Sequence, residues 1–143
     1  MNILFICTGN TCRSPMATAI FNHQWLDKGE AKSVGLFAVE GEDAALHTLN
    51  VLKENGIELK HQSRQLKEED IEWASLVLTM TASHKAMLMN NFPGAADKIF
   101  TLKEYVNGPD AALDVIDPYG GDIHVYRSTF AELKELINRI FKD

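Results

Sequence analysis

The chain has 143 residues, of which 45% are hydrophobic and 24% charged, and its formal net charge is −6. This length fits a single domain over residues 1–143, which can bury a core without metal or disulfide support. The acidic balance argues against a nucleic-acid surface, because such a surface needs clustered Lys and Arg. The early apolar run is too short to span a bilayer and follows no basic leader, so we expect a cytoplasmic protein.

Apolar runs alternate with amphipathic segments along the chain. In chain order, we expect a strand at 2–6, a helix at 15–28, a strand at 33–38, helices at 43–55 and 68–73, a strand at 75–80, a helix at 83–91, a strand at 98–102 and a helix at 122–141. Pro15 suits a first helical turn and Gly29 a helix end, while Asp43 and Asp122 are candidate N-caps. A long loop is expected over 107–121.

Strands that alternate with helices predict an α/β fold. Right-handed crossovers place the strands in a four-stranded parallel sheet with helices on both faces, as a three-layer sandwich. Such folds bind ligands at the carboxyl ends of their strands. The loop CTGNTCRS, residues 7–14, leaves the first strand at this edge and enters the first helix. Its position makes it the leading candidate for a functional site.

The residues of this loop suit the binding of phosphate. Successive backbone N–H groups that lead into a helix N-terminus form an anion site. Gly9 permits a tight turn, and Arg13 offers a planar fork for two phosphate oxygens. Cys7 lies at the base of the loop, where the positive field favours its thiolate form. A thiolate that faces phosphorus is a nucleophile for phosphoryl transfer.

A cysteine followed by five residues and Arg-Ser resembles the P-loop of the cysteine-dependent phosphatases. In the form CTGNTCRS near the N-terminus, it closely resembles the low-molecular-weight protein tyrosine phosphatase family, and the likeness continues to the stretch DPYGG. The resemblance implies that Asp117 is the general acid and that Tyr119 lines the pocket mouth. Independently, Pro118 favours an extended backbone that can hold a carboxyl over a site. Asp110 and Asp114 are expected to be solvated loop residues.

The resemblance also implies a set of phosphate-binding and supporting residues. The phosphate-binding set is Thr8, Gly9, Asn10, Thr11, Cys12, Ser14 and Tyr119. The Ser14 hydroxyl should hydrogen-bond the Cys7 sulfur and ease its departure from a phosphoenzyme. Ser33 and His61 should hold Asn10 and the loop. The sequence reads SVG where the family commonly has SAG, so Val34 is a departure behind the loop.

The mechanism that the family implies has two steps and uses no metal or other cofactor. Cys7 attacks phosphorus while Arg13 and the loop amides stabilise the phosphoryl oxygens, and Asp117 protonates the leaving atom. Water, activated by Asp117, then hydrolyses the phosphocysteine. We expect phosphorylated proteins as substrates, phosphate or other oxyanions as loop ligands, and a monomer that binds neither nucleic acid nor membranes.

Thr11 bears on the choice of substrate. Family members specific for phosphotyrosine usually have a bulkier aliphatic residue at this position, whereas the bacterial protein-arginine-phosphatase branch resembles this chain in carrying Thr. The stretches SVGLFAVEGEDA and FTLKEYV also resemble that branch. We therefore predict a phosphoarginine phosphatase, with a protein-tyrosine phosphatase as the alternative.

Other interpretations stay open at this stage. An arsenate reductase resembles the family in fold and loop but needs further cysteines to relay a disulfide, and this chain has two, Cys7 and Cys12. A non-enzymatic phosphate-binding module would not need a general acid. Cys12 either fills the loop or forms a reversible disulfide with Cys7. The histidines without metal-ligand spacing, which we expect on the surface or on helix faces, are His23, His47, His84 and His124.

Overall fold

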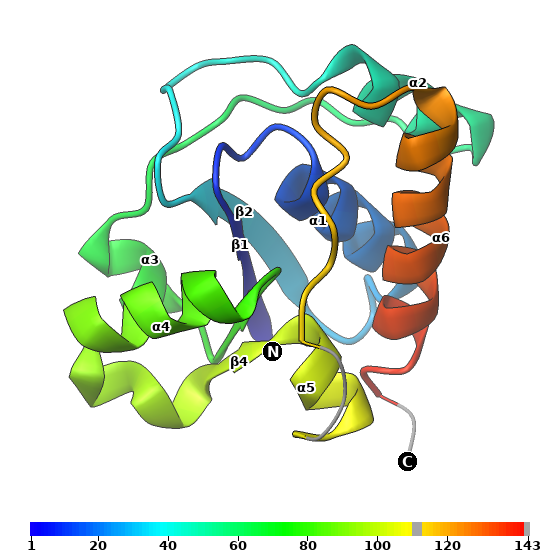
Figure 1. Cartoon of the computed structure of the whole chain (residues 1–143). Coiled ribbons are helices and arrows are strands. Elements are labelled where there is room, and N and C mark those ends of the chain that lie inside the picture. The colour runs from blue at the N-terminus through cyan, green and yellow to red at the C-terminus, as the bar shows by residue number, and fades with distance from the viewer. Residues whose placement is uncertain (110–112, 142–143) are drawn as a thin grey trace.

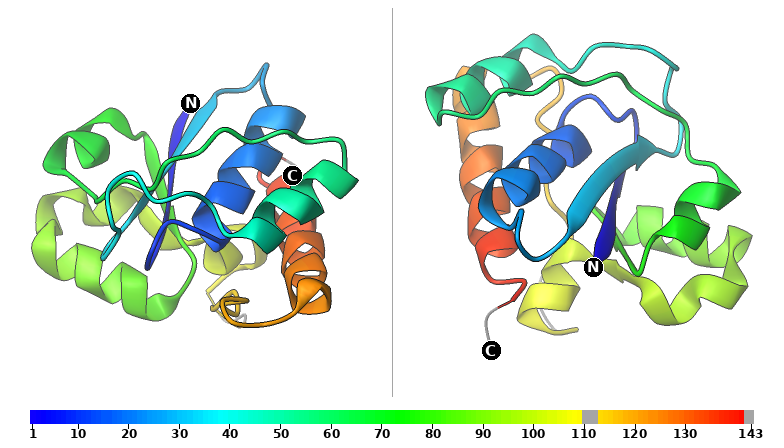
Figure 2. Two further views of the ribbon diagram at one scale, coloured as in Figure 1. Left: turned by 90° about the horizontal axis from the view of Figure 1, so that it is seen from above. Right: turned by 180° about the vertical axis from the view of Figure 1, so that it is seen from behind.

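The structure is a computed structural model that describes residues 1–109 and 113–141, so Asp110 lies outside the described residues. Its sheet has four parallel strands in the order β2-β1-β3-β4. The strands are β1 (Asn2–Cys7), β2 (Glu30–Gly35), β3 (Leu76–Thr79) and β4 (Ile99–Thr101). Helices lie on both faces of the sheet (Figure 1, Figure 2). The predicted α/β fold with three layers is confirmed.

The helices divide between the two faces. In chain order they are α1 (Arg13–Gln24), α2 (Leu46–Glu54), α3 (Glu68–Trp73), α4 (Ala82–Asn91), the 3-10 helix η1 (Pro93–Lys98), α5 (Leu102–Asn107) and α6 (Ile123–Asn138). Helices α1 and α6 pack together on one face with α2 beside them, and α3 and α4 cover the other face (Figure 2). No helix in the described ranges has the length and apolar character to cross a bilayer.

Strand β1 is buried on both of its faces. Ile3 and Phe5 belong to the core built with α1, α2 and α6, whereas Leu4 and Ile6 belong to the core under α3 and α4. Side chains alternate between the two faces of a strand, so a continuous apolar run is what a central parallel strand requires. Burial of this run fixes the position of the loop that follows Cys7.

The first helix and the second strand differ from their predicted bounds. Helix α1 ends at Gln24 instead of Lys28. Gly29 marks a close approach, because a Cβ there would collide with the Met1 carbonyl oxygen. Strand β2 starts at Glu30 instead of residue 33 and ends at Gly35, because it pairs residue by residue with β1. Pairing with the neighbouring strand therefore decided the bounds.

The prediction that Asp43 caps the second helix is wrong. Helix α2 begins at Leu46 after Ala45, and Asp43 instead pairs with Gln62 in an isolated antiparallel bridge. The Ala45 N–H donates to the Thr11 carbonyl oxygen at 3.0 Å. The start of α2 is thus set by a contact with the loop after β1, which no local signal reveals.

Two other helix starts are readable in the sequence. The Asp122 side chain accepts hydrogen bonds from the backbone N–H groups at the start of α6, so this predicted cap is confirmed, although the helix ends at Asn138 rather than near Phe141. Helix α5 is not among the predicted elements. Thr101 and Glu104 form a capping box at its start, and the stretch TLKE carries that signal.

Candidate active site

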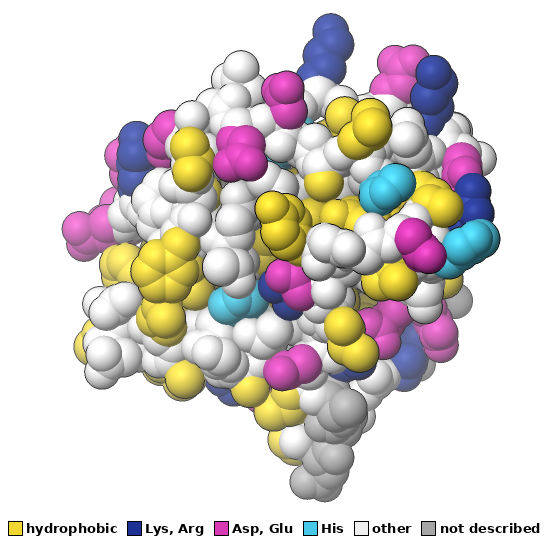
Figure 3. Space-filling model, turned by 45° about the horizontal axis from the view of Figure 1, so that its top comes forward, with side chains coloured by type: hydrophobic (Ala, Val, Ile, Leu, Met, Phe, Trp, Pro, Cys, Tyr) yellow, Lys and Arg dark blue, Asp and Glu magenta, His cyan; other side chains and the backbone are white. Residues whose placement is uncertain are grey.

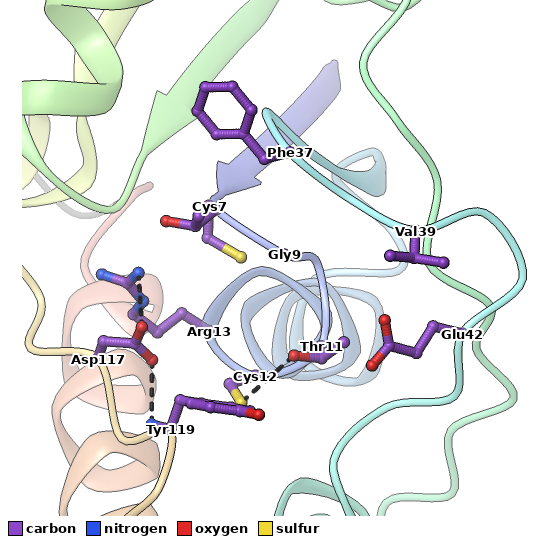
Figure 4. Close-up of a pocket in the computed structure, with 11 residues that line it drawn as sticks. Cys7, Gly9, Thr11, Cys12, Arg13, Phe37, Val39, Glu42, Asp117 and Tyr119 are labelled. Atoms are coloured by element: carbon purple, nitrogen blue, oxygen red, sulfur yellow. Dashed lines mark hydrogen bonds and ion pairs between the residues drawn. The ribbon is translucent and has the colours of Figure 1, made fainter.

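A pocket of about 230 Å³ opens at the carboxyl edge of the sheet. The loop between β1 and α1 forms its floor, the segment after β2 supplies Phe37, Val39 and Glu42, and the segment before α6 supplies Asp117 and Tyr119 (Figure 4). Three stretches far apart in the sequence meet here because all three connect elements at this edge. The residues of the predicted site that line the pocket are Cys7, Thr8, Gly9, Thr11, Cys12, Arg13, Asp117 and Tyr119.

Asn10 holds the shape of the loop from behind. It is fully buried and has a φ of 58°, a left-handed conformation that residues other than glycine rarely adopt. Its Nδ2 donates to Ser14 Oγ at 2.9 Å, and its Oδ1 accepts from the Arg64 N–H at 3.0 Å. Its carbonyl oxygen accepts from His61 Nε2 at 2.6 Å and from Ser63 Oγ at 2.7 Å. These four bonds lock the turn.

The prediction that Gly9 makes the tight turn needs correction as a result. A Cβ at Gly9 would have a single neighbour within 4 Å, Thr11 Oγ1 at 3.9 Å. The fold therefore does not require glycine there, and the tight turn is made by Asn10. Next to the loop, the fold requires glycine at Gly35, since a Cβ there would lie 2.6 Å from the Thr8 carbonyl oxygen.

Ser14 is placed to stabilise negative charge on sulfur. The Cys7 Sγ and Ser14 Oγ atoms lie 2.9 Å apart, and both side chains are buried. Because Ser14 Oγ already accepts from the Asn10 amide, its own proton is free to point at the sulfur. A hydrogen bond to a thiolate is charge-assisted and so favours the charged form.

Arg13 is buried beneath the pocket, and one of its nitrogens, Nε, lacks a hydrogen-bond partner in the described part of the chain. Its Nη1 donates to the Val115 carbonyl oxygen at 2.8 Å, and its Nη2 lies 3.5 Å from Asp117 Oδ2. Its Nε is buried and has no hydrogen-bond partner among the described residues. A buried N–H without a partner is costly, so Nε is a donor suited to an oxygen of a bound oxyanion.

Asp117 lies over the loop from the α6 side. Its side chain is 49% exposed, and its Oδ1 accepts from the Tyr119 N–H at 3.0 Å. Gly120 has a φ of 82°, and the Gly121 N–H donates to the Pro118 carbonyl oxygen at 2.8 Å, so the stretch turns tightly. The turn leaves the carboxylate facing Arg13 (Figure 4). Tyr119 is 76% exposed at the rim.

Two residues near the site make contacts that the sequence did not predict. Asp114 is an exposed loop residue, as expected, but its Oδ1 also accepts from the Ala82 N–H at 2.7 Å, at the start of α4. His84 lies on α4, where the expected helix face is buried instead of exposed, and its Nε2 lies 2.9 Å from Thr8 Oγ1. Burial, and then the Arg13 guanidinium, lower the pKa of His84 to about 4. The imidazole is therefore neutral at pH 7.

The site residues that the sequence analysis did not predict are His84, Ser63 and the pocket-lining Phe37, Val39 and Glu42. His84 follows the carboxyl end of β3, the strand next to β1, and this position at the binding edge was the available signal. Ser63 lies in the connection between α2 and α3, where no pattern marks it. Among the described residues, Ser33 makes no side-chain hydrogen bond to Asn10. It lies opposite Phe5 in the sheet, and Ser63 takes the place expected for it.

His61 and Val34 lie behind the loop. The His61 ring must donate from Nε2, because its partner is the Asn10 carbonyl oxygen. Burial lowers the pKa of His61, although the bond to Asn10 opposes this shift. The ring is therefore the neutral Nε2–H tautomer at pH 7. Val34 is fully buried in the core under α3 and α4, so this departure from the family pattern packs away from the pocket.

Cys12 and Cys7 are both free thiols in the structure. Cys12 Sγ lies 3.4 Å from the Tyr126 hydroxyl and 3.6 Å from Thr11 Oγ1. Burial raises the pKa of Cys12, so its thiol is protonated at neutral pH. The two cysteines of the loop thus have different surroundings, and only Cys7 has the Ser14 hydroxyl beside its sulfur.

Comparisons with known proteins agree with this site. A family model described as low molecular weight phosphotyrosine protein phosphatase matches residues 2–143. A protein-arginine-phosphatase of Geobacillus stearothermophilus is 54% identical over 138 residues, which cover 96% of this chain and 92% of the relative. A protein-arginine-phosphatase of Bacillus subtilis is 46% identical over 145 residues, which cover 99% of this chain and 95% of the relative.

A solved structure of similar fold comes from the YwlE arginine phosphatase, in a C7S mutant with a phosphorylated active-site serine. It matches with a TM-score of 0.93 at 44% identity, and the match covers 98% of this chain and 93% of that one. The likeness therefore extends over the whole fold and includes the elements that carry the pocket.

Proposed function

Since the chain belongs to the low molecular weight phosphotyrosine protein phosphatase family, we propose that it removes phosphoryl groups from arginine side chains of proteins. The predicted family is confirmed, and the chain is a cysteine-dependent protein phosphatase. The proposal concerns the bond that the enzyme cleaves and the roles of the enzyme's side chains. The observation that supports these roles best is the meeting of Cys7, Arg13 and Asp117 in one pocket.

In the first step, the Cys7 thiolate attacks phosphorus and the bond from phosphorus to the leaving nitrogen breaks. Arg13 and the backbone N–H groups of residues 8–13 hold the phosphoryl oxygens, and Arg13 Nε, unpartnered within the described residues, is a donor available to them. Asp117, in its protonated form, gives its proton to the leaving guanidine, which departs as an arginine guanidinium. The products are phosphocysteine, ionised Asp117 and the dephosphorylated protein.

In the second step, a water molecule attacks phosphorus from the side where the leaving group departed. The Asp117 carboxylate takes a proton from this water, the bond from sulfur to phosphorus breaks, and phosphate is released. The Ser14 hydroxyl, 2.9 Å from the sulfur, stabilises the departing thiolate. The cycle ends with the Cys7 thiolate and protonated Asp117, as it began. This scheme needs no metal ion or other cofactor.

The charge of the pocket supports phosphoarginine as the substrate. Asp117 lines the pocket, and once it has given up its proton its carboxylate can meet the positive charge of the departing guanidinium. Thr11 also lines the pocket, and its hydroxyl can hydrogen-bond a guanidinium nitrogen where an aliphatic residue cannot. The relatives of this chain named above are protein-arginine-phosphatases.

Phosphotyrosine is the second candidate substrate. Phe37, Val39 and Tyr119 line the pocket and are each at least 66% exposed, so they offer an apolar wall to an aromatic ring. The description of the family also names phosphotyrosine. We further propose that free phosphate and similar oxyanions bind in the loop, and that the enzyme acts as a cytoplasmic monomer.

The deciding experiment compares kcat/KM on two peptides of the same sequence, one phosphorylated on arginine and one on tyrosine. We expect a higher value for the phosphoarginine peptide and no turnover of either peptide by Cys7→Ser. Thr11→Ile should shift the ratio of the two constants toward phosphotyrosine. A wild-type preference for the phosphotyrosine peptide would overturn the substrate proposal, and an unchanged ratio in Thr11→Ile would remove Thr11 as the selector.

A further inference from the structure

The pocket contains one carboxylate that the proposed reaction does not use. Three charged side chains line it, Arg13, Asp117 and Glu42. Arg13 and Asp117 face each other at 3.5 Å. Within the described part of the chain, the Glu42 carboxylate has neither an ion-pair partner nor a side-chain hydrogen bond. A pocket built to bind a phosphoryl dianion thus keeps an uncompensated negative charge in its wall.

The backbone around Glu42 is held firmly although its side chain is exposed. The Glu42 N–H donates to the Val39 carbonyl oxygen at 3.3 Å, and its own carbonyl oxygen accepts from the Ser63 N–H at 2.8 Å. The Gly41 N–H donates to the Ser63 carbonyl oxygen at 2.9 Å. Ser63 also holds Asn10 of the phosphate-binding loop through its hydroxyl. Glu42 is therefore positioned relative to the loop by a shared anchor.

Glu42 and Asp117 stand on opposite sides of the pocket. In the close-up, Asp117 lies beside Arg13, whereas the Glu42 carboxylate points toward Thr11 from the far wall (Figure 4). On the face shown in Figure 3, hydrophobic side chains gather in the middle and acidic side chains surround them. A substrate whose phosphoryl group lies over Cys7 therefore meets Glu42 with a more distant part of itself.

A carboxylate in this position opposes the binding of a phosphate dianion unless the substrate also brings a cation. We propose that Glu42 is a specificity-determining residue that receives a cationic group of the substrate, and so selects phosphorylated side chains in basic surroundings. This inference rests on the proposed function, because it takes the pocket over Cys7 as the place where the phosphorylated residue binds. The cation is a lysine or arginine beside that residue, or the guanidinium of phosphoarginine itself.

Glu40 provides a matched control two residues away. It is also an exposed carboxylate, but it does not line the pocket, and its Oε1 accepts from the Gln65 N–H at 2.9 Å. In Glu40→Gln, the side-chain amide oxygen can still accept this hydrogen bond from the Gln65 N–H. Glu42→Gln and Glu40→Gln therefore remove the same charge from the same segment, but Glu42→Gln alone changes the pocket wall.

The test measures kcat/KM for four peptides with wild type, Glu42→Gln and Glu40→Gln. Two peptides carry one phosphoarginine with neutral or with lysine neighbours, and two carry phosphotyrosine in the same sequences. For an exposed ion pair we expect Glu42→Gln to lower the preference for lysine neighbours by roughly three- to fivefold, through KM. Glu40→Gln should keep the wild-type preference. High salt should weaken the wild-type preference.

The outcomes separate the two sources of the cation. If Glu42→Gln lowers kcat/KM for the lysine-flanked peptides alone, the cation is a neighbouring residue. If it lowers kcat/KM equally for both phosphoarginine peptides and not for the phosphotyrosine peptides, the cation is the guanidinium itself. The inference is overturned if Glu42→Gln and Glu40→Gln behave alike on all four peptides. If the wild type hydrolyses only phosphotyrosine, the proposed function fails, and the two phosphotyrosine peptides still decide the role of Glu42.

Discussion

Replacement of Asn10 tests how the phosphate-binding loop is held. Asn10 combines a left-handed backbone with two side-chain hydrogen bonds, a buried one to Ser14 Oγ and a partly buried one from the Arg64 N–H. Asn10→Ala removes both bonds and leaves a Cβ in the unfavourable conformation. Asn10→Gly removes the same bonds, but glycine adopts the left-handed conformation without strain. The two variants thus separate the hydrogen bonds from the backbone conformation.

The expected magnitudes follow from these contacts. Two lost hydrogen bonds cost about 2 kcal/mol of the free energy of unfolding, at about 1 kcal/mol each. Alanine in the left-handed region adds about 1 to 2 kcal/mol, so Asn10→Ala should lose about 3 to 4 kcal/mol in all. Glycine instead adds about 0.5 to 1 kcal/mol through the freedom of the unfolded chain. Asn10→Gly should therefore be the more stable variant, by about 0.5 to 1 kcal/mol.

Urea unfolding at pH 7 gives these free energies. The value of kcat/KM on a small aryl phosphate shows whether the loop still supports catalysis. Both variants should lose activity, because the Ser14 hydroxyl is no longer held against the Cys7 sulfur. Asn50→Ala is the control, since Asn50 is exposed on α2 and makes no side-chain hydrogen bond with the described residues. It should stay within about 0.5 kcal/mol of wild type.

Two results would refute the reasoning about Asn10. If Asn10→Ala is as stable as Asn10→Gly or more so, the left-handed conformation is not a constraint at this position. If both variants unfold within about 0.5 kcal/mol of wild type and remain active, the two side-chain hydrogen bonds of Asn10 do not hold the loop.

Three further predictions concern the acid, the buried imidazole and the glycine behind the loop. Asp117→Asn should lower kcat/KM, which reports the first step, about a hundredfold or more for substrates with poor leaving groups and much less for those with good ones; equal losses of kcat/KM for both count against an acid role. His84 has its ordinary pKa of 6.5 in the unfolded chain but a pKa of about 4 in the folded chain. Because the unfolded chain binds the proton first as pH drops through this window, the free energy of unfolding falls there. In urea unfolding between these pH values, His84→Gln should make the free energy of unfolding depend less steeply on pH. An unchanged slope contradicts the lowered pKa of His84. Gly35→Ala places a Cβ 2.6 Å from the Thr8 carbonyl oxygen and should cost about 1 to 3 kcal/mol of stability together with activity. Gly94→Ala, with no atom within 4 Å of its Cβ, is the control; similar losses in both variants would show that the close approach at Gly35 is unimportant.

The parts of the fold that were predictable are those with local causes. The apolar run of β1 is long enough for a buried strand and too short for a helix, and Asp122 can accept hydrogen bonds from the N–H groups that follow it. Alternation of strands and helices then predicts a parallel sheet and a binding edge. The position of the loop CTGNTCRS at that edge was predictable for the same reason.

The parts that were not predictable depend on partners distant in the chain. The start of α2 depends on the Thr11 carbonyl oxygen, and the bounds of β2 depend on its pairing with β1. His84 is buried because α4 packs its first turn against Thr8, and a lone histidine in a sequence carries no sign of that. Ser63 holds Asn10 where Ser33 was expected, because the register of β2 places Ser33 opposite Phe5.

The sequence by itself determined the chemistry that is available in this protein: a cysteine and an arginine on one short loop that ends a buried strand and opens a helix. The tertiary structure alone decided which further side chains complete the site. Glu42, His84 and Ser63 reach the loop from segments whose own residues do not specify where they pack. Their positions follow from closing the sheet and burying both of its faces, which is a property of the whole chain.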